Sequence, residues 1–255
     1  MATFDQTQLT GSSLQNPTSL QFGPDGRLYV SQVNGVIKAF TVATSSGAYS
    51  VTSTETINLV NAMPNHNDDG TFNAAVTGRQ VTGILVIGTA QSPTLYVSSS
   101  DPRIGAGASQ SDTGLDTNSG ILSRLTKTAS GWGKEDLVVG LPRSEENHSV
   151  NGMQIDPVTG HLLLTVGGNT NVGAPSANFA YLSEYAYGSC VVDIDLAAIN
   201  TLPSTTYRGQ TYRCILPTVN DPTRADGPSG IDVVAAGQPE VFGGNDGLNQ
   251  ARLTP

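Results

Sequence analysis

The stretch PTSLQFGPDGRLYV, residues 17–30, decides the fold class. Two short runs of strand-forming residues, 18–22 and 28–30, flank Pro24-Asp25-Gly26. Clusters of Pro, Asp and Gly between such runs are typical of tight turns. The stretch therefore predicts two neighbouring antiparallel strands joined by a short turn.

The same arrangement recurs at a fixed interval. Leu28, Leu95 and Leu162 each open an apolar run, and successive members of this set are 67 residues apart. Further short strands are expected around each run, at 18–22, 35–40 and 56–60, at 83–86, 120–125 and 135–139, and at 152–155, 190–194 and 211–216. Four short strands per repeated unit, joined by Gly- and Pro-rich turns, predict an all-β fold, a β-propeller of four-stranded antiparallel blades. A β-sandwich is the main rival, but it does not predict equal spacing.

About three blades are present, at residues 14–60, 78–140 and 145–216, and a polar tail follows at 217–255. Propellers close into a ring, which protects their edge strands. We therefore interpret residues 1–255 as a partial propeller domain, the N-terminal part of a longer protein.

Composition excludes two classes of partner. The 255 residues include 12 Lys and Arg against 21 Asp and Glu, a net charge of −9, which lacks the basic footprint that nucleic acid requires. No apolar run reaches the roughly 18 residues of a membrane span. The N-terminus has neither a basic nor an apolar signal region, so the protein is cytosolic or has lost a signal peptide.

Cys190 and Cys214 leave two alternatives open. The pair could close one disulfide if their strands are neighbours, or it could remain as two buried free thiols. No CxxC motif or zinc-ligand spacing accompanies them.

Beyond residues 17–30, three segments carry a resemblance to a known family: RQVTGI at 79–84, SSDPR at 99–103 and GLPRSEENHS at 140–149. Together they resemble the glucose/sorbosone dehydrogenase family, whose members include soluble quinoprotein sugar dehydrogenases with a six-bladed propeller. The resemblance implies that this chain is the first half of such a ring. It also implies that the complete protein oxidises a sugar hydroxyl group by hydride transfer to pyrroloquinoline quinone, polarised by Ca²⁺.

The resemblance implies roles for particular residues. His148 matches the general base that accepts the proton of the sugar hydroxyl, and Gln80 falls near a glutamine that contacts the quinone. The family carries Gly-Asp after the following strand, where this chain has Gly167-Gly168. Because that aspartate orients the base, its absence predicts weak activity. The alternative is that His148 is a loop residue that hydrogen-bonds its neighbours.

Two further groups of residues are candidates for ligand binding. Arg79 and Arg143, near long loops or blade starts, could neutralise an anionic cofactor, although solvated surface is the ordinary place for an arginine. Asn67, Asp68 and Asp69 lie in an Asx-rich string whose oxygen atoms suit Ca²⁺, or which forms an ordinary turn.

The leading hypothesis is a quinone-dependent sugar dehydrogenase of a secreted, periplasmic or cell-surface bacterial protein. This chain alone is expected to be inactive. Its expected partners are a sugar or polysaccharide, the remaining half of the propeller and other domains of a longer chain. The alternatives are a non-catalytic extracellular propeller that binds carbohydrate or protein, and a module that only spaces neighbouring domains.

Overall fold

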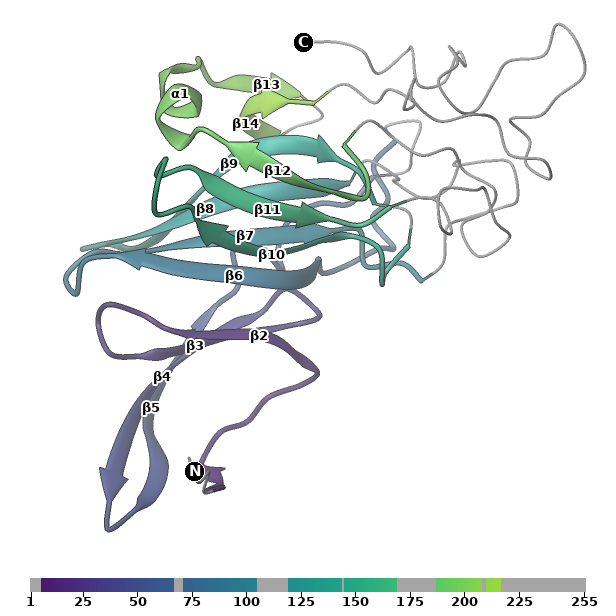
Figure 1. Cartoon of the computed structure of the whole chain (residues 1–255). Coiled ribbons are helices and arrows are strands. Elements are labelled where there is room, and N and C mark those ends of the chain that lie inside the picture. Colours follow the sequence, from purple (N-terminus) through teal and green to yellow (C-terminus); the bar gives the residue numbers. More distant parts are fainter. Residues whose placement is uncertain are drawn as a thin grey trace, which may run out of the picture.

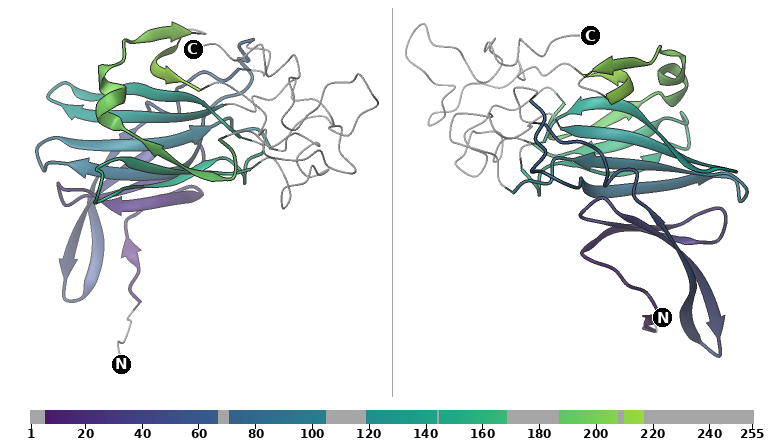
Figure 2. Two further views of the ribbon diagram at one scale, coloured as in Figure 1. Left: turned by 45° about the horizontal axis from the view of Figure 1, so that its top comes forward. Right: turned by 180° about the vertical axis from the view of Figure 1, so that it is seen from behind.

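Three β-sheets and one short helix make up the computed structural model, which describes residues 6–66, 71–104, 119–143, 145–168, 187–207 and 210–216 (Figure 1). The five-stranded sheet has the order β1-β5-β4-β3-β2, with β1 at Leu9–Thr10, β2 at Pro17–Phe22, β3 at Leu28–Gln32, β4 at Ile37–Ser45 and β5 at Ala48–Ile57. The far ends of β4 and β5 project beyond β2 and β3, and β1 pairs with β5 in this projecting part (Figure 2).

The second sheet has six strands and the third has three. The six-stranded sheet has the order β13-β14-β9-β8-β7-β6, with β6 at Gln80–Gly88, β7 at Pro93–Ser100, β8 at Gly120–Thr128, β9 at Gly131–Leu141, β13 at Thr205–Tyr207 and β14 at Gln210–Ile215. The three-stranded sheet has the order β10-β11-β12, with β10 at Val150–Ile155, β11 at Leu162–Val166 and β12 at Cys190–Ile194. Helix α1 spans Leu196–Thr201, and no helix among the described residues is long and apolar enough to cross a membrane.

The repeat seen in the sequence is also a repeat of strand register. Leu28, Leu95 and Leu162 lie on the second strand of their units, opposite Phe22, Val86 and Ile155 of the first strand. Each first strand carries an irregularity at the same place, and a hydroxyl group of the second strand donates to a carbonyl of the first beside it. These bonds are Ser31 Oγ to Ser19 O, Ser98 Oγ to Gly83 O and Thr165 Oγ1 to Gly152 O, at 3.2, 3.3 and 3.0 Å.

The prediction of four-stranded antiparallel blades is nevertheless wrong. The sheets have five, six and three strands, two of the pairings are parallel, and no closed barrel or blade propeller is evident among the described residues. The segment predicted as the fourth strand of the third unit is β14, which instead pairs in parallel with β9 of the second sheet. Tyr212 lies opposite Asp136 and Cys214 lies opposite Val138. Local sequence predicts that β14 is a strand, but not which strand edge it joins.

The six-stranded sheet is buried on both faces. On one face Ile84 and Val86 pack with Tyr29 and Ile37 of the five-stranded sheet. On the other face Leu85 packs with residues of the three-stranded sheet, among them Leu162 and Leu164. Because side chains alternate across a strand, a strand buried on both sides has to be apolar at consecutive positions, as the run at 84–87 is.

Gln21 makes hydrogen bonds to backbone groups of β6 on the side of that strand that faces away from β7. Its side chain donates from Nε2 to the Val86 carbonyl at 3.0 Å and accepts from the Val86 backbone N–H at Oε1, at 2.7 Å. Two residues earlier on β2, Ser19 Oγ accepts from the Ile84 N–H at 3.4 Å. Polar side chains of β2 thereby make the hydrogen bonds that a further strand would otherwise supply.

Cys190 and Cys214 are free thiols in different sheets. Cys190 lies opposite Val166 in the three-stranded sheet, and Cys214 lies opposite Val138 in the six-stranded sheet. Burial raises the pKa of the Cys214 thiol. Of the two alternatives left open by the sequence, the structure has the free thiols.

Glu55 links the five-stranded and six-stranded sheets. Its carboxylate pairs with Arg27 at 2.5 Å, with Lys127 of β8, and accepts from Trp132 Nε1 of β9 at 3.1 Å. Burial alone would raise the pKa of the Glu55 carboxyl group. The hydrogen bonds from Lys127 and Arg27 outweigh this effect and hold the pKa below its ordinary value.

This link predicts a pH dependence of stability. A carboxylate whose pKa is lowered by folding contributes stability above its unfolded pKa, and the contribution is lost as pH falls through the folded pKa. We expect Glu55→Gln to reduce the free energy of unfolding at pH 7 by about 0.5–1 kcal/mol, as for a partly exposed ion pair. The difference from wild type should shrink as pH falls below about 4.5. Urea unfolding across this range measures it, and a difference that grows in acid would contradict the assignment.

Candidate functional site

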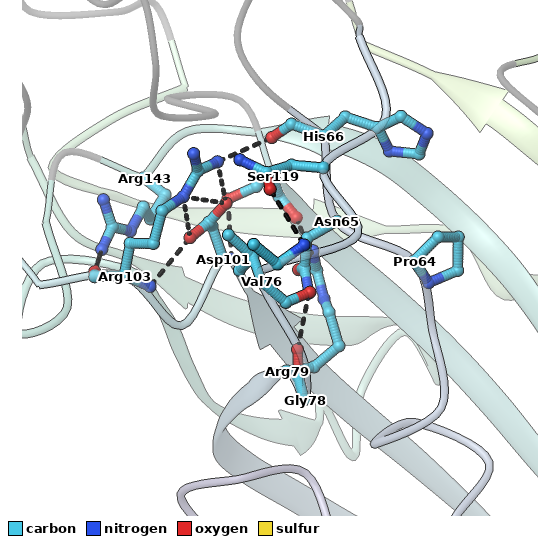
Figure 3. A network of polar contacts seen from close by, with 12 residues as sticks. Pro64, Asn65, His66, Val76, Gly78, Arg79, Asp101, Arg103, Ser119 and Arg143 are labelled. Atoms are coloured by element: carbon cyan, nitrogen blue, oxygen red, sulfur yellow. Dashed lines mark hydrogen bonds and ion pairs between the residues drawn. The ribbon is translucent and has the colours of Figure 1, made fainter.

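The antiparallel order of β6 to β9 brings four chain segments to one end of the six-stranded sheet. β6 and β8 begin at this end and β7 and β9 finish there, so their flanking residues meet although they are far apart in sequence. These flanking residues are Arg79, Asp101, Arg103, Ser119 and Arg143, and Figure 3 shows them gathered with Asn65 and His66 in one polar network.

Asp101 and Arg103 form the best-defined pair in this network. The Asp101 side chain is fully buried, and Arg103 donates to its carboxylate from Nε at 2.9 and 3.0 Å and from the backbone N–H at 2.8 Å. Arg103 also donates to the His66 carbonyl at 2.7 Å, and the Asp101 N–H donates to Ser119 Oγ at 2.9 Å. The pair therefore connects the end of β7 to two neighbouring loops.

Arg79 is held inside the network by neutral oxygen atoms. Its guanidinium donates to Asn65 Oδ1 at 2.9 Å and to the Ser119 carbonyl, and only 2% of the residue is exposed. Asn65 is itself placed by donation from Nδ2 to the carbonyls of Val76 and Gly78, at 3.1 and 2.7 Å. Arg79 thus joins the loop before β6 to the loop before β8.

Arg143 is fully buried at the end of β9 and donates to the Arg103 carbonyl. Burial penalises the charged form and lowers the pKa of this guanidinium, which nearby Asp101 and Glu146 oppose. The buried Asp101 carboxylate is therefore ion-paired with Arg103 and also acts electrostatically on Arg143.

Gln80 connects the network to the loop before β10. Its Nε2 donates to the Glu146 carbonyl at 2.5 Å, and its Oε1 accepts from Ser100 Oγ at 3.3 Å. In the same loop, burial and the neighbouring Glu146 charge raise the pKa of Glu145.

His148 follows in this loop and has a defined ring orientation. Nδ1 lies 3.1 Å from the Gly168 carbonyl oxygen. A carbonyl only accepts, so Nδ1 carries a proton and Nε2 is the basic nitrogen of the neutral ring. The Gly168 carbonyl thereby makes an orienting contact of the kind that the resemblance assigned to an aspartate, which this chain lacks.

Gly167 explains how the end of β11 comes so close to His148. A Cβ atom at position 167 would lie 2.6–2.9 Å from the backbone C, Cα and O atoms of His148. No L side chain fits at that separation. Gly167 is thus the sequence signal for this contact, although a single glycine does not reveal its partner.

The remaining candidates from the sequence are the predicted calcium ligands. Asn67, Asp68 and Asp69 lie outside the described residues, and the part of the chain that is described contains no cluster of three or more His, Cys, Asp or Glu side chains that could hold a metal ion. The local sequence gives no sign that Asn65, Asp101 and Ser119 lie together, because these residues come from loops that are far apart in the chain.

Comparisons with known proteins found no matching family model and no matching curated protein. Two similar solved structures are an iodide and a calcium structure of a Trichoderma reesei carbohydrate-active enzyme of family AA12, each 16% identical to this chain. The TM-scores are 0.42 and 0.43, and the alignments cover 77% and 80% of this chain. The chain spans 39% and 42% of the length of those two chains.

The predicted membership of the glucose/sorbosone dehydrogenase family is wrong. The mixed sheets of five, six and three strands differ from the four-stranded blades that the resemblance implied. The motifs on which the resemblance rested are short strand, turn and loop segments, which unrelated β proteins can share.

We expect Asp101→Asn to reduce the free energy of unfolding by about 3 kcal/mol, because it removes one partner of a buried ion pair. Glu135→Gln is the matched control. Glu135 also pairs with arginines, Arg124 and Arg213, but its side chain is 29% exposed, and a loss below about 1 kcal/mol is expected. Urea unfolding of both variants measures the difference. Equal losses in the free energy of unfolding would show that the Asp101–Arg103 pair stabilises the fold no more than a partly exposed ion pair does.

We expect Gly167→Ala to displace the His148 backbone and break the contact between Nδ1 and the Gly168 carbonyl. The NMR signals of the His148 imidazole should then shift. Gly133→Ala is the control, because a Cβ there meets nothing closer than 4.0 Å. Unchanged His148 signals in Gly167→Ala would show that the close approach does not orient the ring.

Proposed function

We propose that this chain contributes the proton acceptor of an oxidoreductase that acts on a sugar hydroxyl group, and that His148 is that acceptor. The observation that carries the proposal is the contact between Nδ1 and the Gly168 carbonyl, which leaves Nε2 as the basic nitrogen. A basic imidazole nitrogen can accept a proton from a substrate hydroxyl group that lies within hydrogen-bonding reach.

The chemistry requires two separate transfers. Oxidation of an alcohol breaks a C–H bond, whose electron pair leaves as hydride, and an O–H bond, whose proton goes to a base as the C=O bond forms. In this proposal His148 Nε2 takes the proton. The Gly168 carbonyl bonded to Nδ1–H then stabilises the imidazolium by keeping one of its two N–H groups hydrogen-bonded.

Pyrroloquinoline quinone, with Ca²⁺, is the proposed cofactor of the complete protein, where it would supply the hydride acceptor. The side chains predicted to contact it are Arg79, Gln80 and Arg143. Each is less than a tenth exposed and makes hydrogen bonds to protein atoms. This arrangement does not support direct contact with a quinone, so the proposal is restricted to proton transfer at His148.

The setting of the activity is part of the proposal. A secreted, periplasmic or cell-surface protein would meet a sugar or polysaccharide outside the cell. Because the chain spans about two fifths of the similar solved chains, further segments of a longer protein would complete the substrate site.

We expect His148→Ala to lower turnover by about 10²–10⁴-fold, the usual contribution of a general base. The experiment uses the complete protein with pyrroloquinoline quinone and Ca²⁺, in a dye-linked assay against a panel of sugars. His161→Ala is the control, because His161 lies at the β10–β11 turn and bonds Asp193 at 2.8 Å.

Two outcomes would overturn the proposal. An unchanged rate in His148→Ala would remove the base role. The absence of any sugar oxidation by the wild-type protein, together with binding of the same sugars, would favour the non-catalytic carbohydrate-binding alternative.

A further inference from the structure

The two outer sheets each have one face that does not pack on the six-stranded sheet. Because the three units share one register, residues of their first three strands on these outer faces have counterparts inside the molecule. Leu20 and Phe22 of β2 correspond to Ile84 and Val86 of β6. The counterparts show what kind of neighbour each outer face fits.

The outer face of the five-stranded sheet, here called the β2 face, carries exposed apolar side chains. Leu20 is 66% exposed and Phe22 is 58% exposed, whereas their counterparts Ile84 and Val86 are 6% and 3% exposed. The counterparts are covered by the preceding unit, whose Tyr29 packs in the same cluster. The β2 face therefore has the character of a surface that another unit covers.

The outer face of the three-stranded sheet, here called the β12 face, has the complementary character. Val191 lies opposite Thr165 and is 60% exposed, whereas its counterparts Ile37, opposite Ser31, and Leu122, opposite Ser98, are fully buried. Gln154 lies opposite Leu163 and is exposed on the same face.

Gln154 is the counterpart of Gln21, which lies opposite Tyr29 in the first unit. Gln21 bonds both the N–H and the C=O of Val86 across the interface between the first two sheets. Phe22 is the counterpart of Val86. One chain therefore carries both partners of this contact: Gln154 on the β12 face and the Phe22 backbone on the β2 face.

We propose that copies of this chain associate head to tail, with the β2 face of one copy on the β12 face of the next. In this interface the Gln154 amide bonds the Phe22 backbone, and Leu20 and Phe22 pack on Leu163 and Val191. Opposite charges accompany the apolar contact, because Lys38 shares the β2 face and Asp193 shares the β12 face. The interface repeats a packing that the chain already makes between its own first and second sheets.

The geometry of such an interface is heterologous. Each copy uses two different faces, so one face remains open at each end of a pair, and a series of copies or a ring results. This distinguishes the proposal from a two-fold symmetric dimer, in which one face would pair with itself.

The test combines two blocked variants of this chain in sedimentation velocity. Phe22→Glu blocks the β2 face and Val191→Glu blocks the β12 face, and since both positions are exposed the variants should retain the wild-type circular dichroism and melting temperature. Wild type should form species larger than dimers as concentration rises, and each variant alone should be monomeric. An equimolar mixture should form a one-to-one dimer and nothing larger, because only one intact pair of faces remains.

Further variants sharpen the result. Val158→Glu should associate as wild type does, because Val158 is 88% exposed in the β10–β11 turn, away from both faces. Gln154→Ala should weaken association roughly tenfold, as expected for lost neutral hydrogen bonds. A wild-type chain that stays monomeric, a Phe22→Glu variant that still self-associates, or a mixture that stays monomeric would each overturn the proposal.

Discussion

Burial of β6 is the constraint on which the described structure depends. The strand lies at the edge of the six-stranded sheet, yet both of its faces are covered, by the five-stranded sheet on one side and the three-stranded sheet on the other. Its outward N–H and C=O groups therefore need partners away from bulk water. Gln21 and Ser19 provide them from β2, which ties the first sheet to the second through hydrogen bonds as well as apolar contact.

The same stacking positions the candidate site. Thr82 Oγ1 and Ser98 Oγ donate to the carbonyls of Val150 and Asn151, which fixes the start of β10 against the six-stranded sheet. His148 precedes β10 by two residues, and Gly168 follows β11 by two, so pairing of these strands brings imidazole and carbonyl together. Functional groups gather at this end because strand beginnings and ends alternate in an antiparallel sheet.

His148 and Gln80 stand out in the sequence, and the Gln80 side chain bonds the backbone of the loop that carries His148. The orienting contact at His148 could not be read from the sequence, because a backbone carbonyl belongs to every residue and leaves no side-chain signature. The charge of the Arg79 and Arg143 side chains predicts that they are exposed to solvent or bind a ligand. Their burial depends on acceptors from loops distant in sequence, among them Asn65, Ser119 and the Arg103 carbonyl.

Sequence by itself determined where the strands lie, because turn residues and apolar patterns act over only a few residues. It also showed that the strands recur, because the same pattern returns every 67 residues from Leu28. Tertiary structure decided which edges those strands join. The segment 211–216 is predicted to be the last strand of the third unit, yet β14 in this segment lies parallel to β9. This pairing also separates Cys214 from Cys190. Strand edges offer the same backbone groups whatever their sequence, so the choice of partner depends on how the whole chain packs.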